Sequence, residues 1–226
     1  MARATGRAAL WDMDGTLVDT GDLHYQAWVR LTRDLRLPFT RADFEATFGW
    51  RNPEIIRKLF GRHYTEAEVA EIGARKEEFY RASARECGVV LLPGARTLLE
   101  GLAAEGFQQA IGSSAPRENV DLILQLTQTE QLFQGIVSME DTQRGKPDPQ
   151  VFLIAAKKVE IEPARCVVIE DAVVGVQAAK AGGMKCIAVT FAGHHPVARL
   201  QGAGADLVAS SLAEVSVAKV LNLLNG

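Results

Sequence analysis

The sequence is poor in cysteine and has no long apolar run, and both absences narrow the class of protein. Its three cysteines, Cys87, Cys166 and Cys186, lie far apart and lack CxxC or Cys/His spacing. This pattern indicates neither a disulfide framework nor a zinc site. Cys166 and Cys186 lie inside apolar runs, so we expect buried, reduced thiols. No run approaches the roughly 18 apolar residues that span a bilayer, so we expect no membrane partner.

Clusters of basic residues are absent too. The net charge of −3 comes from well-mixed charges, without the Lys/Arg stripe that would follow a nucleic-acid backbone. We therefore expect no nucleic-acid partner. The segment from Met1 to Ala9 is basic but lacks the apolar stretch of a signal peptide, which predicts a cytoplasmic location. A monomer is the starting expectation for the oligomeric state.

Short apolar runs separated by helical segments dominate the rest of the chain. Strands that alternate with helices predict a parallel sheet covered on both faces, an α/β doubly wound core. With 226 residues and 47% apolar composition, the chain can bury such a core without crosslinks. The predicted strands are Ala8 to Trp11, Phe107 to Gly112, Gly135 to Met139, Cys166 to Ile169, Cys186 to Thr190 and Asp206 to Ala209.

This alternation stops between Asp19 and about Val90. Apolar residues recur there at helical spacing, in one stripe at Leu23, Ala27, Leu31 and Leu35 and in another at Val69, Ile72, Lys76 and Phe79. A stretch of this length without a clear strand predicts a small helical domain inserted into the α/β core. We place the inserted domain at residues 19–90 and the core at residues 1–18 and 91–226, with the turn at Pro93-Gly94 near the exit.

The most informative string is Asp12-Met13-Asp14-Gly15-Thr16-Leu17-Val18-Asp19-Thr20, at the end of the first predicted strand. The carboxyl ends of parallel strands form the ligand-binding edge of an α/β sheet. Two acids separated by one residue can project to the same side, and Gly15 lets the backbone turn away. One carboxylate could then attack while the other moves a proton. Alternatively, both are solvated turn residues before a helix.

Two further segments end at the same predicted edge. Ser113 and Ser114 close a strand and precede Pro116 at a helix start, where backbone N–H groups can hold a phosphate. Either serine could equally be a plain helix cap. Lys146 lies between Gly145 and Pro147, just ahead of another helix start. An isolated loop lysine is usually solvated, so this segment is weak by itself.

A fourth segment runs the buried strand from Cys166 directly into Glu170 and Asp171. Adjacent carboxylates at a strand end suit a hard cation such as Mg²⁺, although Asp171 could instead cap the next helix. Two like charges about 4 Å apart repel by roughly 4 kcal/mol at an effective dielectric of 20. Acids at this edge would therefore repel a phosphate dianion unless a metal ion and Lys146 compensate them.

These four segments, in this order, resemble the four motifs of the haloacid dehalogenase superfamily, and the resemblance covers essentially the whole chain. It implies that Asp12 is the nucleophile, Asp14 the general acid/base and Ser113 the ligand of the transferring phosphoryl group. Lys146 would link the nucleophile to the phosphate. Thr16 and Ser114 are substrate-binding candidates beside them. The implied Mg²⁺ ligands are Asp12, the backbone carbonyl of Asp14, Asp171 and, directly or through water, Glu170.

The helical insertion resembles the mobile cap of the β-phosphoglucomutase-like branch of that superfamily. By position, His24, Arg51 and Lys76 resemble residues that contact substrate there. Arg51 could grip a second phosphate or sugar hydroxyls through two hydrogen bonds. Alternatively, His24 could be a helix-surface residue, and Lys76 could pair with Glu77 or with the surroundings of Glu78 on a solvated face. His194-His195 suggests a solvated loop rather than a metal site, because no third ligand follows at usable spacing.

The preferred prediction is a Mg²⁺-dependent phosphatase that hydrolyses a small phosphomonoester, such as a sugar phosphate, through an aspartyl-phosphate intermediate. Halogen and phosphonate chemistry are set aside, because family members with those activities lack an acid at the position of Asp14. β-Phosphoglucomutase activity is the alternative, although Trp50 and Asn52 around Arg51 depart from the mutase pattern. A non-catalytic phosphate-binding regulatory protein is the alternative from another class.

Overall fold

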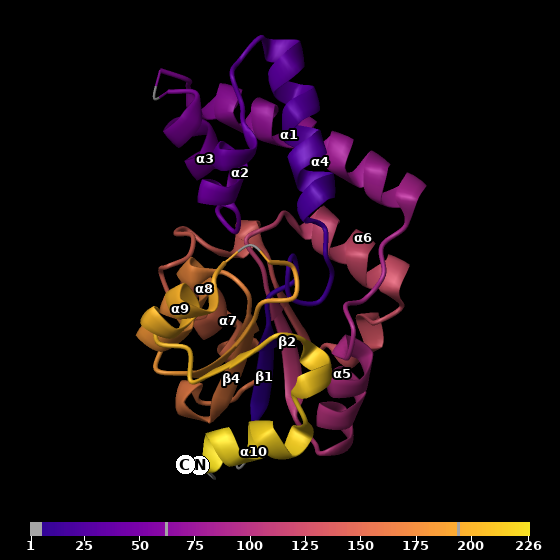
Figure 1. Cartoon of the computed structure of the whole chain (residues 1–226), viewed down its shortest axis with the longest axis vertical. Helices are drawn as coiled ribbons and strands as arrows, with labels where there is room; N and C mark the ends of the chain where they lie inside the picture. Colours follow the sequence, from indigo (N-terminus) through magenta and orange to yellow (C-terminus); the bar gives the residue numbers. More distant parts are fainter. Residues whose placement is uncertain (1–5, 62, 194) are drawn as a thin grey trace.

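The computed structural model describes residues 6–61, 63–193 and 195–226. Within them lies one parallel sheet of six strands in the order β3-β2-β1-β4-β5-β6. In chain order the strands are β1 (Ala8–Trp11), β2 (Gln108–Gly112), β3 (Gly135–Val137), β4 (Cys166–Glu170), β5 (Lys185–Val189) and β6 (Leu207–Ala209). Leu10 of β1 is in register with Ala110 of β2 and Val168 of β4, so β1 lies at the centre (Figure 1).

Helices cover both faces of the sheet, and the α/β doubly wound prediction is confirmed. Successive strand residues point to opposite faces, so Ala9 and Trp11 enter one apolar cluster while Ala8 and Leu10 enter the other. The first cluster includes side chains of α5 (Ala95–Ala104), α6 (Arg117–Thr127) and α10 (Val217–Asn225). The second includes side chains of α7 (Gln150–Lys158), α8 (Val173–Ala181) and α9 (Val197–Gly202). Both faces of the central strands are therefore apolar, as a buried parallel sheet requires.

The strand order creates the ligand-binding edge. The chain moves outward from β1 through β2 to β3 in one direction and through β4 and β5 to β6 in the other. At the point where the order reverses, the loops after neighbouring strands diverge and leave a crevice at their carboxyl ends. Asp12 follows β1, Ser113 follows β2, and Glu170 is the last residue of β4.

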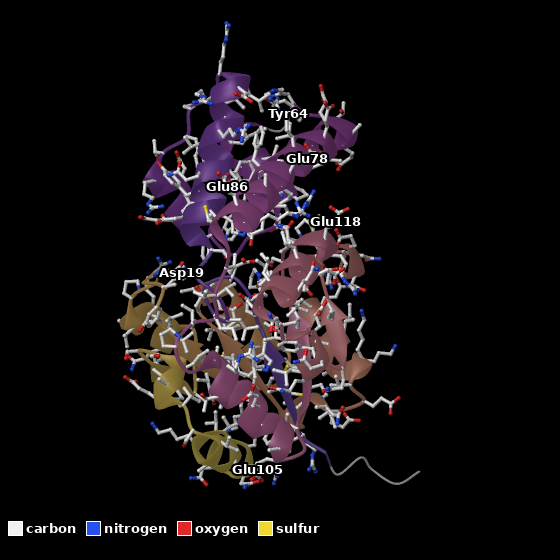
Figure 2. All side chains as sticks on the ribbon, turned by 90° about the vertical axis from the view of Figure 1, so that its right-hand side faces the viewer. Asp19, Tyr64, Glu78, Glu86, Glu105 and Glu118 are labelled. Carbon is white, nitrogen blue, oxygen red and sulfur yellow. The ribbon has the colours of Figure 1, made fainter. Side chains whose placement is uncertain are left out.

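Among the described residues, four helices lie between β1 and α5 and form a separate body above the sheet edge (Figures 1 and 2). They are α1 (Gly21–Leu35), α2 (Arg41–Thr47), α3 (Asn52–Leu59) and α4 (Glu66–Cys87). Their shared core contains Trp28, Leu31, Ile56 and Val69. Thr40 and Thr65 begin α2 and α4 with reciprocal capping contacts to Asp43 and Glu68. We call this body the cap.

The two connections between the cap and the core run side by side. Val18 and Leu91 form an antiparallel bridge, and the Leu92 N–H donates to the Leu17 carbonyl over 2.8 Å. The chain thus passes between the cap and the core through two neighbouring segments, which is the geometry of a hinge. We propose the division at residues 18/19 and 90/91 on this basis.

Six predicted strand boundaries lie one or two residues from those of the structure. β4 extends to Glu170, β5 spans Lys185–Val189 rather than Cys186–Thr190, and β6 begins at Leu207 rather than Asp206. The end of β3 and the start of β2 differ as well. The strand predicted from Gly135 to Met139 ends at Val137, because Ser138 and Asp141 cap a short 3₁₀ helix over Met139–Asp141. The Ser138 N–H and hydroxyl both donate to Asp141 Oδ2, at 2.9 and 3.1 Å. The strand predicted to begin at Phe107 begins one residue later, at Gln108.

Two further expectations concern burial and membranes. Cys166 and Cys186 are buried, as predicted, and Cys87 is exposed. No helix among the described residues is long and apolar enough to cross a membrane.

Candidate active site

Asp12, Lys146 and Glu170 form a buried ion cluster at the carboxyl end of β1 and β4. Lys146 Nζ lies 2.6 Å from Asp12 Oδ1 and 2.7 Å from Glu170 Oε1. Asp12 is 8% exposed, Lys146 6% and Glu170 1%. One ammonium group thus serves two carboxylates, and the cluster retains an excess negative charge. The ammonium group of Lys146 also lies over the ring of Phe152, with Nζ 4.8 Å from the ring centroid.

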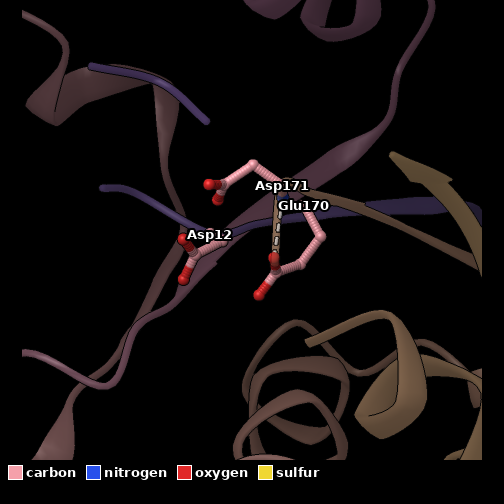
Figure 3. Close-up of side chains that lie close together, drawn as sticks. All are labelled: Asp12, Glu170 and Asp171. Atoms are coloured by element: carbon pink, nitrogen blue, oxygen red, sulfur yellow. Dashed lines mark hydrogen bonds between the residues drawn. The ribbon is translucent and has the colours of Figure 1, made fainter. Parts of the chain in front are cut away.

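Asp171 brings a third carboxylate to the same place (Figure 3). Carboxylate oxygens of Asp12, Glu170 and Asp171 all lie within 4.8 Å of one another. Thr16 donates to Asp171 Oδ1 over 3.1 Å, while Asp171 Oδ2 is buried and has no hydrogen-bond partner. A buried carboxylate oxygen without a partner is costly unless a cation neutralises it. The donor set of closely spaced oxygens fits a hard cation such as Mg²⁺.

The pKa values of Asp12 and Asp171 also favour a bound cation at this position. Burial raises the pKa of Asp12 to about 7, and the neighbouring Glu170 contributes, although Lys146 opposes the change. Burial, followed by the charges of Glu170 and Asp12, raises the pKa of Asp171 well above its ordinary value. Both carboxyl groups would be ionised more easily beside a divalent cation.

Glu170 differs from the other two acids because both of its oxygens already have partners. Oε1 accepts from Lys146, and Oε2 accepts from the backbone N–H groups of Asp171 and Ala172 at 2.7 and 2.6 Å. Two glycines make room for this packing. A Cβ on Gly175 would lie 1.6 Å from Glu170 Oε1, and a Cβ on Gly15, whose φ is +90°, would lie 2.2 Å from Asp171 Oδ2. Only glycine fits at either position.

Asp14 is held by residues of the cap and of the connection to it. Thr20 donates a short hydrogen bond to Asp14 Oδ1, His24 Nε2 lies 3.3 Å from the same oxygen, and the Tyr80 hydroxyl lies 3.5 Å away. Burial alone would raise the pKa of Asp14, but His24 and the hydrogen bond from Thr20 outweigh it and lower this pKa below its ordinary value. In the absence of a bound cation, the two aspartates of the first motif thus have pKa values moved in opposite directions, so that Asp14 is ionised more easily than Asp12.

His24 connects Asp14 to Lys76. Lys76 Nζ lies 2.6 Å from His24 Nδ1, and the ring of Tyr80 stacks on the imidazole with centroids 3.9 Å apart. An ammonium group can only donate, so Nδ1 accepts and Nε2 carries the hydrogen that points to Asp14. Lys76 also pairs with Glu77 at 2.9 Å, and its side chain is 3% exposed. The charge of Lys76 is therefore already balanced within the cap.

Ser113 follows β2 and lines the same pocket as Asp12 and Asp14. It is 2% exposed, its N–H donates to the Val137 carbonyl over 3.0 Å, and its hydroxyl accepts from the Ala115 N–H. The loop from Ser113 to Pro116 is therefore fixed at both ends, and α6 begins immediately after it at Arg117.

A pocket between the cap and the core joins these groups. Its volume is about 60 Å³, which is small for a sugar phosphate, so we expect the cap to move when a substrate binds. Of the predicted site residues, Asp12, Asp14, His24, Lys76, Ser113 and Ser114 line it. Lys146, Glu170 and Asp171 do not line it but lie close to Asp12 in the buried cluster. Thr16 is fully buried and donates to Asp171.

Arg51 is absent from the residues that line this pocket. Its side chain instead lies beside the loop that carries Lys146, so that a Cβ on Gly145 would meet Arg51 Cδ at 2.7 Å. Asn52, the next residue, lines the pocket in its place. The sequence offered no means of distinguishing the two, because which side chain of a helix start points inward depends on how the helix docks.

Several other contributors were not singled out from the sequence. Thr20, Asn52, Glu77 and Tyr80 contact or surround the predicted site residues. Thr20 stands in the first motif, Glu77 follows Lys76 and Asn52 follows Arg51, so proximity was a usable signal for these three. Tyr80 carried no comparable signal. His194, part of the predicted solvated loop, lies outside the described residues, as do residues 1–5 of the N-terminal segment.

Comparisons with known proteins agree with the four-motif resemblance. The family model of the haloacid dehalogenase-like hydrolases matches residues 9–189. Beta-phosphoglucomutase of Bacillus subtilis is 33% identical over 189 residues, which cover 81% of this chain and 83% of that protein. A phosphorylated carbohydrates phosphatase of Thermotoga maritima is 28% identical over 223 residues, 96% of this chain and 97% of that protein.

A solved structure has the same fold over almost the full length. The crystal structure of beta-phosphoglucomutase from Clostridium difficile matches with a TM-score of 0.87 at 23% identity, covering 98% of each chain. At this identity the likeness establishes the fold and not the activity. Together with the family match over residues 9–189, it confirms the resemblance found in the motifs: the chain belongs to the haloacid dehalogenase-like hydrolases.

Proposed function

We propose that the protein is a metal-dependent phosphatase that hydrolyses a small phosphomonoester, such as a sugar phosphate, through a phosphoryl group carried on Asp12. The observation that supports it most is the placement of Asp12, whose carboxylate lies at the pocket, 2.6 Å from Lys146 and beside Asp14. A protein that only bound phosphate would gain nothing from an anionic side chain at that point.

We propose Asp12, Asp171 and the backbone carbonyl of Asp14 as the ligands of a Mg²⁺ ion. The partnerless Oδ2 of Asp171 and the raised pKa values of Asp12 and Asp171, caused first by burial, support this assignment. Glu170, whose oxygens already have partners, would act through water or by orienting Lys146. The ion would supply positive charge to the phosphoryl oxygens and hold the carboxylate of Asp12 in its ionised form.

In the first half-reaction, an Asp12 oxygen forms a bond to phosphorus while the bond from phosphorus to the ester oxygen breaks. The leaving oxygen takes a proton from Asp14, whose pKa is lowered in the substrate-free protein and would be raised by the negative charge of the bound phosphate. Lys146 and the Ser113 loop stabilise the charge on the phosphoryl oxygens. In the second half-reaction Asp14 accepts a proton from water as that water attacks phosphorus. The bond to Asp12 breaks, and inorganic phosphate and free Asp12 result.

The charges around the pocket favour hydrolysis over mutase activity. A mutase must hold a sugar with phosphates at both ends, so it needs a cation for the phosphate that is not reacting. Lys76 is the lysine that lines the pocket from the cap, and Glu77 neutralises it. Arg51 lies outside the pocket lining. The relatives include both a mutase and a phosphatase by name, so their names do not decide between the two activities. The pairing of Lys76 with Glu77 favours the phosphatase.

The cap wall of the pocket favours a leaving group without a second charge. It is lined by the rings of Trp28, Phe44, Phe48 and Trp50, with Thr47 and Asn52 as polar neighbours. Aromatic rings pack against the C–H faces of sugars and other partly apolar groups, while the few polar groups fix orientation.

The experiment that tests the function is a phosphate-release screen with Mg²⁺ over sugar phosphates, nucleotides and short organic phosphates. β-Glucose 1-phosphate is assayed in parallel for conversion to glucose 6-phosphate. We expect free phosphate from one group of monophosphates and little isomerisation. Isomerisation without release would establish the mutase instead, and no reaction in either assay would favour the non-catalytic binding protein.

Metal binding can be tested without turnover. Asp171→Asn removes one of the crowded charges while keeping the shape of the side chain, so the metal-free variant should melt at the same temperature as the parent or higher. Added Mg²⁺ should raise the melting temperature of the parent and leave that of the variant nearly unchanged, because a ligand stabilises only the form that binds it. Differential scanning fluorimetry with EDTA or Mg²⁺ measures both effects. An equal Mg²⁺ response in the two proteins would rule out Asp171 as a ligand.

A further inference from the structure

A buried hydrogen-bond chain crosses from the cap to the core at Glu77. Its Oε1 accepts from Lys76 at 2.9 Å and from Asn52 Nδ2 at 2.6 Å, both within the cap. Its Oε2 accepts from Asn119 Nδ2 at 2.6 Å, and Asn119 belongs to α6 of the core. Glu77 is 3% exposed and Asn119 is fully buried. The carboxylate is therefore shared between the two bodies.

Asn119 is fixed on its other side by the cap as well. Arg81 NH1 donates to Asn119 Oδ1 over 3.0 Å, and Arg81 NH2 lies 3.0 Å from Glu118 Oε2. Glu118 is exposed and lies at the boundary between the bodies (Figure 2). Both ends of the Asn119 amide thus bond to α4, and α6 follows directly on the Ser113 loop.

The ionised form of Glu77 depends on these partners. Burial alone would raise the pKa of Glu77, but Lys76, His24 and the amides of Asn119 and Asn52 together hold it below its ordinary value. If the cap swung away about Val18 and Leu91, the Asn119 donor would be lost. Water would then reach the carboxylate and the ammonium of Lys76, and the fixed position of Lys76 against His24 would no longer be enforced.

We propose that Glu77 and Asn119 form an interlock that holds the cap closed and positions Lys76 and His24 beside Asp14 only in the closed arrangement. Both are positioning residues, because Glu77 reaches the pocket chemistry through Lys76, and Asn119 reaches it through Glu77. The interlock connects cap closure to the acid/base residue by a continuous chain: Asn119, Glu77, Lys76, His24 and Asp14.

The test uses a reversal of the bond. Asn119→Asp places a second carboxylate next to that of Glu77, and the two repel each other. Glu77→Gln removes the negative charge that Asn119 and Lys76 both contact. We expect each single variant to lose about 10- to 100-fold in kcat/KM, the effect of one hydrogen bond to a charged group. In the double variant the new amide at position 77 can donate to the new carboxylate at position 119. Its kcat/KM should therefore exceed that of Asn119→Asp. If the two substitutions acted independently, their losses would instead multiply in the double variant.

Small-angle scattering gives a second readout that needs no turnover. Asn119→Asp should have a larger radius of gyration than the parent, and the double variant should return toward the parent value. Asp121→Asn, an exposed ion-pair residue on the same helix, is the matched control and should change neither readout. If Asn119→Asp does not fold, Asn119→Ala replaces it with the same expected losses.

The kinetic arm rests on the proposed phosphatase, while the scattering arm does not. A parent without phosphatase activity would refute the function and leave the interlock to be judged by scattering. Multiplicative losses in the double variant, or a radius of gyration unchanged by Asn119→Asp, would overturn the interlock. A fall in melting temperature without any change in kcat/KM or radius would show that the pair is merely structural.

Discussion

Replacing Asp12 by asparagine should abolish turnover, with kcat falling by at least about 10⁴-fold, because an amide cannot form the covalent phosphoryl intermediate. The fold should survive. Lys146 keeps Glu170 as a partner at 2.7 Å, and the substitution removes a carboxylate whose burial raises its pKa to about 7. The melting temperature of Asp12→Asn should therefore be equal to that of the parent or higher.

Phosphate release at saturating Mg²⁺ and substrate measures the loss, and intact-mass spectrometry of the parent during turnover looks for a protein heavier by one phosphoryl group. Asp34→Asn, which removes a surface partner of Arg75 on the cap, is the control and should retain full activity. If Asp12→Asn keeps activity within about a hundredfold of the parent, Asp12 is not the nucleophile.

Replacing Lys146 by methionine should have the largest effect on stability. The side chain loses the terminal ammonium and keeps an unbranched apolar stem, and Asp12 and Glu170 are left buried with no ammonium between them. Removing one partner of a buried ion pair costs about 3–5 kcal/mol. For a chain of this size, each kcal/mol lowers the melting temperature by roughly 2–4 °C, which gives a fall of about 6–20 °C. Turnover should fall at least about 100-fold, since the phosphoryl oxygens lose a cation.

Thermal unfolding and phosphate release measure these two effects on the same preparation. Lys158→Met is a matched control, because Lys158 pairs with Asp141 at 3.0 Å at a much more exposed position. A pair of this kind contributes no more than about 1 kcal/mol, so the control should change little. Equal melting temperatures for the two variants would show that the cluster around Lys146 does not depend on its charge.

The positions of Asp12, Ser113 and Asp171 could be predicted from the sequence because each directly follows, or nearly follows, a short apolar strand. Apolar runs locate the strands, and the carboxyl ends of parallel strands share one edge, so local pattern and a general rule together bring distant residues to one place. The strand that was predicted to reach Met139 ends at Val137, because the capping contacts between Ser138 and Asp141 compete with the extended conformation.

The partners of these residues could not be predicted in the same way. Lys146 contacts Asp12, 134 positions away in the chain, and also Glu170, and this shared arrangement depends on how the loop docks. Arg51 and Asn52 are adjacent in the sequence, yet only Asn52 lines the pocket. The difference depends on the rotation of α3 against the core, which no local pattern encodes.

The sequence by itself determined the succession of strands and helices along the chain, the residues at the ligand-binding edge and the family. Those features depend on short-range periodicity and on motifs of a few residues. Only the tertiary structure decided which charges are paired. The contact of Lys76 with His24, the contact of Glu77 with Asn119 and the partnerless oxygen of Asp171 all arise where separate elements pack together. Electrostatic energies depend on distance and burial in space, and sequence separation fixes neither.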